Sequence, residues 1–92
     1  MTDVLSRSVT ICNKKGLHAR ASAALAKEAS NFQSKITVAH EEVSADAESV
    51  MDMLMLTAYQ GCAVTVTAEG PDAQAALEAV STLIENRFGE EE

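Results

Sequence analysis

The 92-residue sequence predicts a single two-layer α+β domain, spanning residues 1–92, with the order β-α-β-β-α-β-α. The length is that of one domain. Short segments in which apolar and polar residues alternate predict strands, and segments with an apolar residue every three or four positions predict helices. The first and the last predicted helix each have a single apolar stripe. Three helices on one face of a four-stranded antiparallel sheet would bury these stripes and leave the other face in water, so we expect an open-faced sandwich.

The first half of the chain contains a predicted strand, a helix and two further strands. Leu5 to Cys12 alternates, and Asn13-Lys14-Lys15-Gly16 is typical of a turn. From Leu17 to Phe32 the apolar residues follow a helical period. Alternation returns from Lys35 to His40, and Val43 to Ala45 adds a short strand. His40 has no partner in any motif, and we expect it at the surface.

The second half contains a predicted helix, a strand and a last helix. Ser49-x-x-Asp52 is typical of a helix N-terminus, and this helix is expected to end before Gln60-Gly61. Ala63 to Glu69 alternates. Gly70-Pro71-Asp72 interrupts the chain, and the apolar period from Ala73 to Phe88 predicts the last helix. We expect the acidic tail, residues 89–92, to be frayed.

Composition excludes several classes of protein. The net charge of −7 disfavours binding to nucleic acid through a positive surface. No apolar run reaches the roughly 18 residues that cross a membrane, and the N-terminus lacks a secretory signal, so we expect a cytoplasmic protein without membrane insertion. Cys12, Cys62 and the two histidines do not have the spacing of zinc ligands. We therefore expect reduced thiols, no metal and no cofactor.

His18 is the residue best placed for chemistry. It lies where a predicted turn becomes a helix, and the first helical turn has unpaired N–H groups and the positive pole of the helix dipole, which bind phosphate. We expect this pole to favour the neutral imidazole, which is a nucleophile. Arg20 offers a planar fork for phosphate oxygens. The spacing leaves a second interpretation open, in which His18 is only a polar cap or turn residue.

Gly16-Leu17-His18-Ala19-Arg20, after a strand and at the start of a helix, resembles the active-site signature of the HPr family. These are the histidine-containing phosphocarrier proteins of the phosphoenolpyruvate-dependent phosphotransferase system. The resemblance covers nearly the whole chain, and it includes the HPr-like element order, Ala45-x-x-x-Ser49, Gln60-Gly61 and Ala68-Glu69-Gly70.

The resemblance implies that His18 accepts a phosphoryl group on Nδ1 from phosphorylated enzyme I and passes it to an enzyme II A-type protein. The backbone N–H groups of Ala19 and Ala21, together with Arg20, would hold the phosphoryl group. Such a protein is a carrier grouped with transferases rather than a conventional catalyst.

Two residues depart from the family pattern. The family usually has proline where this chain has Ala21, and alanine restores a backbone N–H in the first helical turn. We expect phosphoryl transfer to survive this change. Many relatives have asparagine where this chain has Lys15, which places in doubt any contact that the asparagine makes.

Ser49 is the second candidate for a functional site. As a helix N-cap it contributes ~1 kcal/mol to stability. By resemblance, its position matches the serine that HPr kinase/phosphorylase modifies in some bacteria, so that kinase is a further candidate partner. A phosphoserine adds roughly −1.5 to −2 charges, which a helix N-terminus accepts. Asp46, Glu48 and Asp52 already surround the site with negative charge, so a modified Ser49 would repel an acidic partner.

The segment from Val50 to Leu56 is too apolar for a helix with one buried face. Either it is buried on both sides with ordinary core methionines, or it forms an exposed docking patch, to which flexible methionines are suited. The resemblance places Val50, Met51 and Leu54 outward and Met53 and Leu56 inward. We expect enzyme I and its acceptor to dock on the outward residues together with Ala23 and Lys27.

Two functions are therefore in competition. The first is a phosphoryl carrier acting through His18, and the second is a regulatory binding module acting through phosphorylation of Ser49. The presence of Gly16, His18 and Arg20 favours the carrier. Its branch stays open between sugar uptake and nitrogen-related regulation, although Ala21, Asp52 and the acidity favour the nitrogen-related branch. We expect a free-standing monomer.

Overall fold

The structure is a computed structural model that describes residues 3–90 of the chain. The strands are β1 (Asp3–Thr10), β2 (Lys35–His40), β3 (Val43–Asp46) and β4 (Ala63–Gly70). The helices are α1 (Ala19–Ala29), α2 (Val50–Met55) and α3 (Ala73–Glu85), and the short 3₁₀ helix η1 (Arg87–Gly89) follows α3. The predicted order of strands and helices is confirmed.

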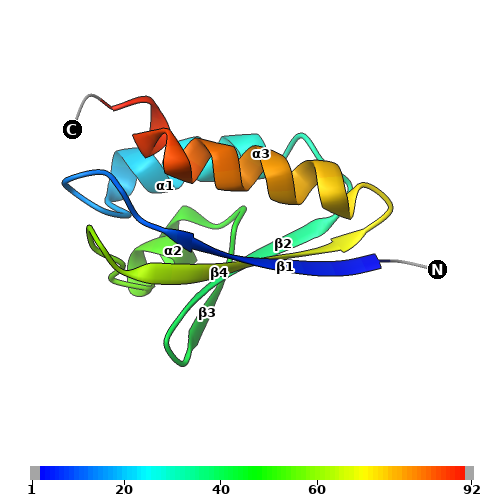
Figure 1. Cartoon of the computed structure of the whole chain (residues 1–92), viewed down its shortest axis with the longest axis horizontal. Coiled ribbons are helices and arrows are strands. Elements are labelled where there is room, and N and C mark those ends of the chain that lie inside the picture. The colour runs from blue at the N-terminus through cyan, green and yellow to red at the C-terminus, as the bar shows by residue number, and fades with distance from the viewer. Residues whose placement is uncertain (1–2, 91–92) are drawn as a thin grey trace.

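The four strands form one antiparallel sheet in the order β1-β4-β2-β3. Because β4 lies between β1 and β2, the sheet joins the two halves of the chain. α1 and α3 run side by side over one face (Figure 1), and α2 contacts α1 and β3. The opposite face carries hydroxyl side chains, among them Ser6 and Thr67, whose oxygens lie 3.1 Å apart. This is the predicted open-faced sandwich.

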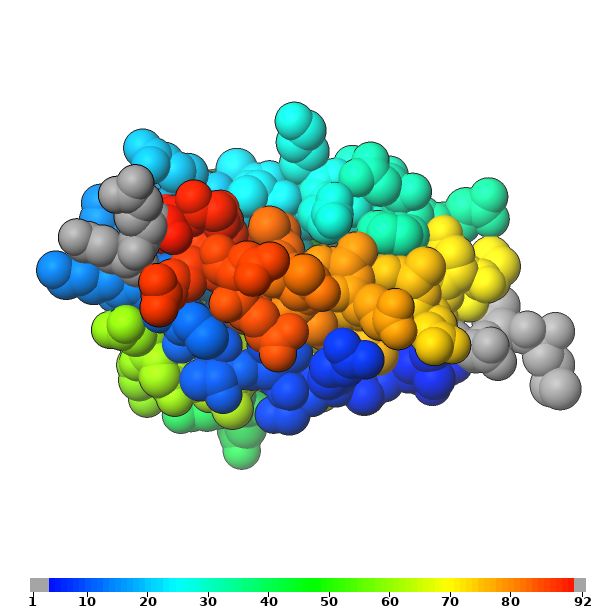
Figure 2. Space-filling model, turned by 45° about the horizontal axis from the view of Figure 1, so that its top comes forward, coloured from blue at the N-terminus to red at the C-terminus, as the bar shows by residue number. Residues whose placement is uncertain are grey.

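The core lies between the sheet and the helices and is aliphatic. Alternate residues of β2 and β4 face the helices because side chains alternate along a strand. The helices contribute mainly small and aliphatic side chains: Ala21, Leu25, Ala29, Ala73, Ala76, Leu77, Val80 and Ile84. Figure 2 shows the outer surface of this helical layer, where α1 and α3 lie against each other.

His40 is buried, so the expectation of a surface position is wrong. The alternation of β2 places His40 on the same side as Ile36 and Val38. Its Nδ1 lies 2.9 Å from the carbonyl oxygen of Leu56, at the end of α2, where carbonyls lack intrahelical partners. Its ring also packs edge-on against Tyr59, with the ring centroids 5.8 Å apart. The imidazole of His40 can therefore be buried because its Nδ1 has a hydrogen-bond partner.

The sequence predicts a frayed tail over residues 89–92. In the structure, Gly89 and Glu90 instead follow a turn that has defined contacts. Phe88 is buried, and Arg87, Phe88 and Gly89 have φ angles of 59°, 56° and 80°. Three successive residues in the left-handed region turn the chain after α3, so that the side chain of Glu90 contacts His18 at the start of α1. Residues 91 and 92 lie outside the described part of the chain.

Candidate functional site

The loop before α1 is held against the chain that follows α2. Gly16 has a φ of +65°, and a Cβ at this position would overlap the carbonyl oxygen of Ala58, so both the conformation and the space require glycine. The N–H of Leu17 donates to the same carbonyl oxygen at 3.0 Å. These contacts fix the position of the residue that follows, His18.

His18 is the N-cap of α1, at the turn-to-helix junction that the sequence predicts. Its backbone is extended, and its Nδ1 accepts a hydrogen bond from the N–H of Arg20 at 3.3 Å. Its carbonyl oxygen accepts from the N–H of Ser22 at 2.8 Å. The side chain is 26% exposed. Nδ1 therefore faces the end of the helix that favours an anion, and solvent reaches the ring.

The other ring nitrogen of His18 contacts a carboxylate. Nε2 lies 2.6 Å from Oε2 of Glu90, and Oε1 of Glu90 accepts from Nδ2 of Asn13 at 2.9 Å. Partial burial raises the pKa of Glu90. The hydrogen bonds from Asn13 and His18, together with the nearby charge of Arg20, outweigh this effect and hold the pKa below its usual value. Glu90 is thus an ionised partner of the imidazole at neutral pH.

Asn13 and Glu90 are the members of this site that sequence reasoning missed. Asn13 is typical of a turn, and Glu90 belongs to an acidic end that is typical of a solvated tail. The two are 77 positions apart, and no local pattern relates them. Nδ2 of Asn13 also donates to the carbonyl oxygen of Gly16 at 2.8 Å, so Asn13 connects the tail to the loop before α1.

The residues expected to hold a phosphoryl group lie around the first turn of α1 but differ in exposure. Ala19 and Arg20 are exposed, whereas Ala21 is fully buried in the core. Within residues 3–90, the N–H groups of Ala19 and Ala21 have no hydrogen-bond acceptor. An incoming anion can therefore reach Ala19 and Arg20 directly, while the methyl group of Ala21 anchors the turn.

Ser49 is the N-cap of α2, which confirms the capping part of the prediction. Its Oγ accepts a hydrogen bond from the N–H of Asp52 at 3.2 Å, and its backbone is extended. Just before it, a carboxylate oxygen of Asp46 accepts from the N–H of Glu48 at 2.9 Å. The start of α2 therefore already uses its own acidic and hydroxyl side chains to satisfy its backbone.

The outward and inward residues of α2 lie as the resemblance implies. Met51 is 73% and Leu54 36% exposed, Val50 is half-buried, and Met53 and Leu56 are buried. Ala23 and Lys27 are exposed on α1, which contacts α2. Met55 and Tyr59 are exposed as well, and we call the set Met51, Leu54, Met55 and Tyr59 the α2 patch. Since Ala58 and Tyr59 adjoin Gly16, the patch borders the loop that carries His18.

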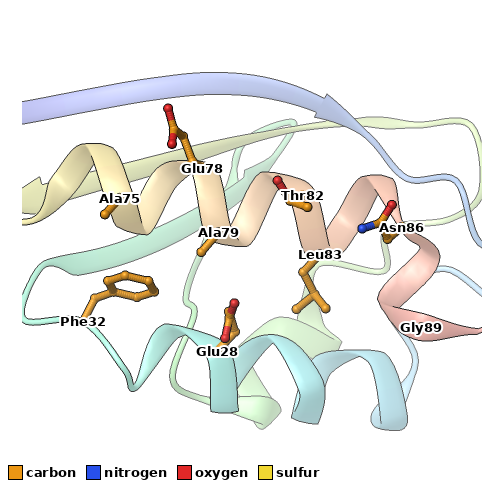
Figure 3. A pocket seen from close by; sticks show the side chains of 9 residues that line it. All are labelled: Glu28, Phe32, Ala75, Glu78, Ala79, Thr82, Leu83, Asn86 and Gly89. Carbon is orange, nitrogen blue, oxygen red and sulfur yellow. The ribbon is translucent and has the colours of Figure 1, made fainter.

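An open groove of about 640 Å³ lies between α1 and α3 (Figure 3). It is lined by Glu28, Phe32, Ala75, Glu78, Ala79, Thr82, Leu83, Asn86 and Gly89, and it contains none of the site residues predicted from the sequence. Among residues 3–90, no group of three or more histidine, cysteine or acidic side chains is arranged to bind a metal ion. Nor does the described chain contain a helix long and apolar enough to cross a membrane.

Comparisons with known proteins agree with the fold and with the motif around His18. The family model described as the PTS HPr component phosphorylation site matches residues 5–86. The phosphocarrier protein HPr of Cupriavidus necator is 48% identical over 89 residues, which cover 97% of this chain and 100% of the relative. The phosphocarrier protein NPr of Shewanella violacea is 48% identical over 86 residues, which cover 94% of each chain. The crystal structure of HPr-C-His from Thermoanaerobacter tengcongensis has a TM-score of 0.90 at 40% identity, covering 96% of this chain and 99% of that one.

Proposed function

Because this chain belongs to the HPr family of phosphocarrier proteins, we propose that His18 accepts a phosphoryl group from phosphorylated enzyme I and passes it to an enzyme II A-type protein. The observation that carries the proposal is the orientation of the His18 ring. Nδ1 faces the amide groups at the start of α1, and Nε2 is hydrogen-bonded to a carboxylate. The ring thus directs the Nδ1 lone pair, which accepts a long hydrogen bond from the N–H of Arg20, to the place where the fold favours an anion.

The chemistry is a nucleophilic transfer in two halves. In the first, the lone pair on Nδ1 of His18 attacks phosphorus. The new N–P bond forms, and the bond to the donor breaks with its electron pair remaining on the donor. The N–H of Ala19 and the guanidinium of Arg20 then stabilise the phosphoryl oxygens electrostatically. In the second half, His18 is the leaving group and the acceptor protein supplies the nucleophile.

We infer that both partner proteins dock on one surface next to His18. The α2 patch and half-buried Val50 offer apolar contact area, and exposed Ala23 and Lys27 extend it along α1. A single surface suits a carrier, because each partner must reach the same nitrogen atom in turn. Exposed methionines suit two different partners, since flexible thioethers repack.

The branch of the pathway is decided by the acceptor. The HPr of Cupriavidus necator and the NPr of Shewanella violacea are both 48% identical to this chain, so identity to these two relatives does not separate the branches. Phosphorylated protein should therefore be offered separately to a sugar-specific and to a nitrogen-related enzyme II A-type protein. The acceptor that takes the phosphoryl group identifies the branch.

The test of the carrier function is a transfer assay with phosphoenolpyruvate and purified enzyme I, read by intact mass. We expect one added phosphoryl group that is lost in acid, its absence in His18→Ala, and its full retention in Ser49→Ala. Folding of each variant is checked by circular dichroism. A folded wild-type protein that takes no phosphoryl group from enzyme I, or a His18→Ala variant that still takes one, would overturn the proposal.

Regulation at Ser49 is a second candidate, and the position of its Oγ at the start of α2 favours it. A phosphate there would meet the backbone N–H of Asp52 that Oγ now caps, so the fold can accept the modification. The added charge would fall beside the α2 patch and weaken the docking of an acidic partner. Incubation with HPr kinase/phosphorylase and ATP tests this function. An acid-stable phosphoryl group that is absent from Ser49→Ala would support it, and no modification would exclude it for that kinase.

A further inference from the structure

The tail after α3 is built to present one carboxylate to His18. Phe88 anchors it in the core, and Arg87 and Phe88 adopt left-handed φ angles of 59° and 56° although neither is glycine. Such conformations cost of order 1–3 kcal/mol each and persist only where the surrounding structure imposes them. The conformation of the tail is what brings the side chain of Glu90 to the imidazole ring.

The two hydrogen bonds of the His18 ring together define its tautomer. The N–H of Arg20 is a donor, so Nδ1 must accept and carries a lone pair. Glu90 is ionised and can only accept, so Nε2 must carry the proton that lies between the two groups. Nδ1 is left as the nucleophile, and the opposite tautomer would break both contacts.

Asn13 in turn holds Glu90 in place. Its Nδ2 donates to Oε1 of Glu90 and to the carbonyl oxygen of Gly16. Asn13 is itself fully buried, which restricts its movement. The carboxylate is thus fixed by one neighbour from the loop before α1 and directs its other oxygen at Nε2. A solvent-exposed glutamate without this support would sample many rotamers.

On the basis of the proposed function, we propose that Glu90 is a positioning residue for phosphoryl transfer, which orients the His18 ring and stabilises the charge that the ring gains. When Nδ1 attacks phosphorus, the N–P bond forms and the donor retains its electron pair, so the ring becomes cationic while Nε2 keeps its proton. The Glu90 carboxylate, 2.6 Å from Nε2, stabilises that positive charge electrostatically. Asn13 acts indirectly, because its side chain holds the Glu90 carboxylate in place.

The test compares Glu90→Ala, Glu90→Gln and Glu85→Gln. Glu90→Ala removes both the acceptor and the charge, whereas Glu90→Gln retains an acceptor oxygen without the charge. Glu85→Gln is the matched control. Glu85 is exposed at the end of α3, so this substitution removes the same charge close to the tail. Unfolding curves show whether each variant keeps the wild-type fold. If Glu90→Ala does not fold, Glu90→Gln takes its place in the comparison with the control.

Two readouts separate positioning from general stability. We expect the rate of phosphorylation by enzyme I to fall about tenfold to a hundredfold in Glu90→Ala, the range of a hydrogen bond to a charged group, with Glu90→Gln between it and the control. In nitrogen-15 NMR of the unphosphorylated protein, we expect a hydrogen-bonded Nε2–H signal for His18. It should be present in wild type and Glu85→Gln and lost in Glu90→Ala.

The outcomes also separate this proposal from the carrier function. If wild type accepts a phosphoryl group and Glu90→Ala transfers as fast as Glu85→Gln, the positioning role is overturned while the carrier function stands. An Nε2–H signal that is unchanged in Glu90→Ala overturns it as well, whatever the rate. If wild type accepts no phosphoryl group, the carrier function fails, and the positioning role in transfer fails with it.

Discussion

The starts of α1 and α2 use the same capping device in opposite electrostatic surroundings. In each, an N-cap residue with extended backbone accepts a hydrogen bond from an N–H in the first turn, His18 from Arg20 and Ser49 from Asp52. Around His18 the nearby sequence supplies Lys14, Lys15 and Arg20. Around Ser49 it supplies Asp46, Glu48 and Asp52.

Capping by itself therefore does not make a helix start reactive. Among residues 3–90, the side chain of Ser49 has one hydrogen-bond partner, the N–H of Asp52 in its own helix. The ring of His18 has a second partner, Glu90, which lies 72 positions further along the chain and defines which ring nitrogen carries the lone pair. The start of α1 is therefore prepared to receive an anion and to react with it, whereas the start of α2 is prepared mainly to begin a helix.

The largest expected effect comes from breaking the geometry of the α1 start with Gly16→Ala. The new methyl group would overlap the Ala58 carbonyl at a φ of +65°, so the loop must shift. We expect a loss of about 1–3 kcal/mol in the free energy of unfolding. We also expect about a hundredfold slower phosphorylation, as for a displacement of about 1 Å at a reacting group. Denaturant unfolding and the enzyme I assay measure the two effects.

Gly61→Ala is the control for the Gly16 substitution. Gly61 also has a positive φ, +93°, but a Cβ there would meet no atom within 4 Å. It should therefore lose stability through backbone strain alone and transfer at nearly the wild-type rate. Equal transfer rates in the two variants would show that the close contact with Ala58 does not position His18.

Arg20→Ala removes a positive charge beside His18 and leaves the cap in place, because the cap uses the backbone N–H of residue 20. We expect phosphoryl transfer to slow by about tenfold to a hundredfold with little change in stability. Arg7→Ala, an exposed arginine on β1, is the matched control. Equal rates for the two variants would remove Arg20 from the phosphoryl site.

Ser49→Ala tests whether the α2 start is chiefly structural. Loss of the cap should lower the free energy of unfolding by about 1 kcal/mol, and transfer by enzyme I should stay at the wild-type rate. Ser49→Thr keeps the hydroxyl group and should retain most of the stability. A tenfold fall in transfer for Ser49→Ala, with the fold intact, would mean that the two helix starts share the transfer function.

The smallest effect is expected at the start of α3. The side chain of its N-cap residue, Asp72, makes no capping hydrogen bond to its own helix. Its carboxylate accepts from the side chain and N–H of Ser34 and from the N–H of Gln33, in the connection before β2. These hydrogen bonds, that from the Ser34 side chain first, hold the pKa of Asp72 below its usual value. Asp72 therefore serves the fold rather than a site.

The pH dependence at Asp72 follows from the direction of this shift. A carboxyl group whose pKa is lower in the folded state stabilises the fold above its unfolded pKa of about 3.9 and loses this contribution as the pH falls through the folded value. The difference in unfolding free energy between wild type and Asp72→Asn should therefore be constant near neutral pH and shrink below about pH 4. A difference that grows in acid would contradict the assignment.

Local patterns in the sequence were sufficient for the order of elements and for the place of His18. A turn, a glycine and an apolar stripe all lie within a few residues of that histidine. His40 was misplaced because its burial depends on Leu56 and Tyr59, which come from beyond the next helix. Glu90 was missed because an acidic chain end looks solvated, and only the anchored Phe88 turns it back toward His18.

The decisive measurement is the position of the phosphoryl group on the phosphorylated protein, determined by phosphorus and nitrogen-15 NMR with labelled histidine. The reactive atom should be the ring nitrogen that faces the start of α1, because Glu90 holds the proton on the other ring nitrogen. We predict a phosphorus–nitrogen coupling to Nδ1 of His18, with Nε2 protonated. A phosphoryl group on Nε2 of His18, on His40 or on Ser49 after reaction with enzyme I would contradict it.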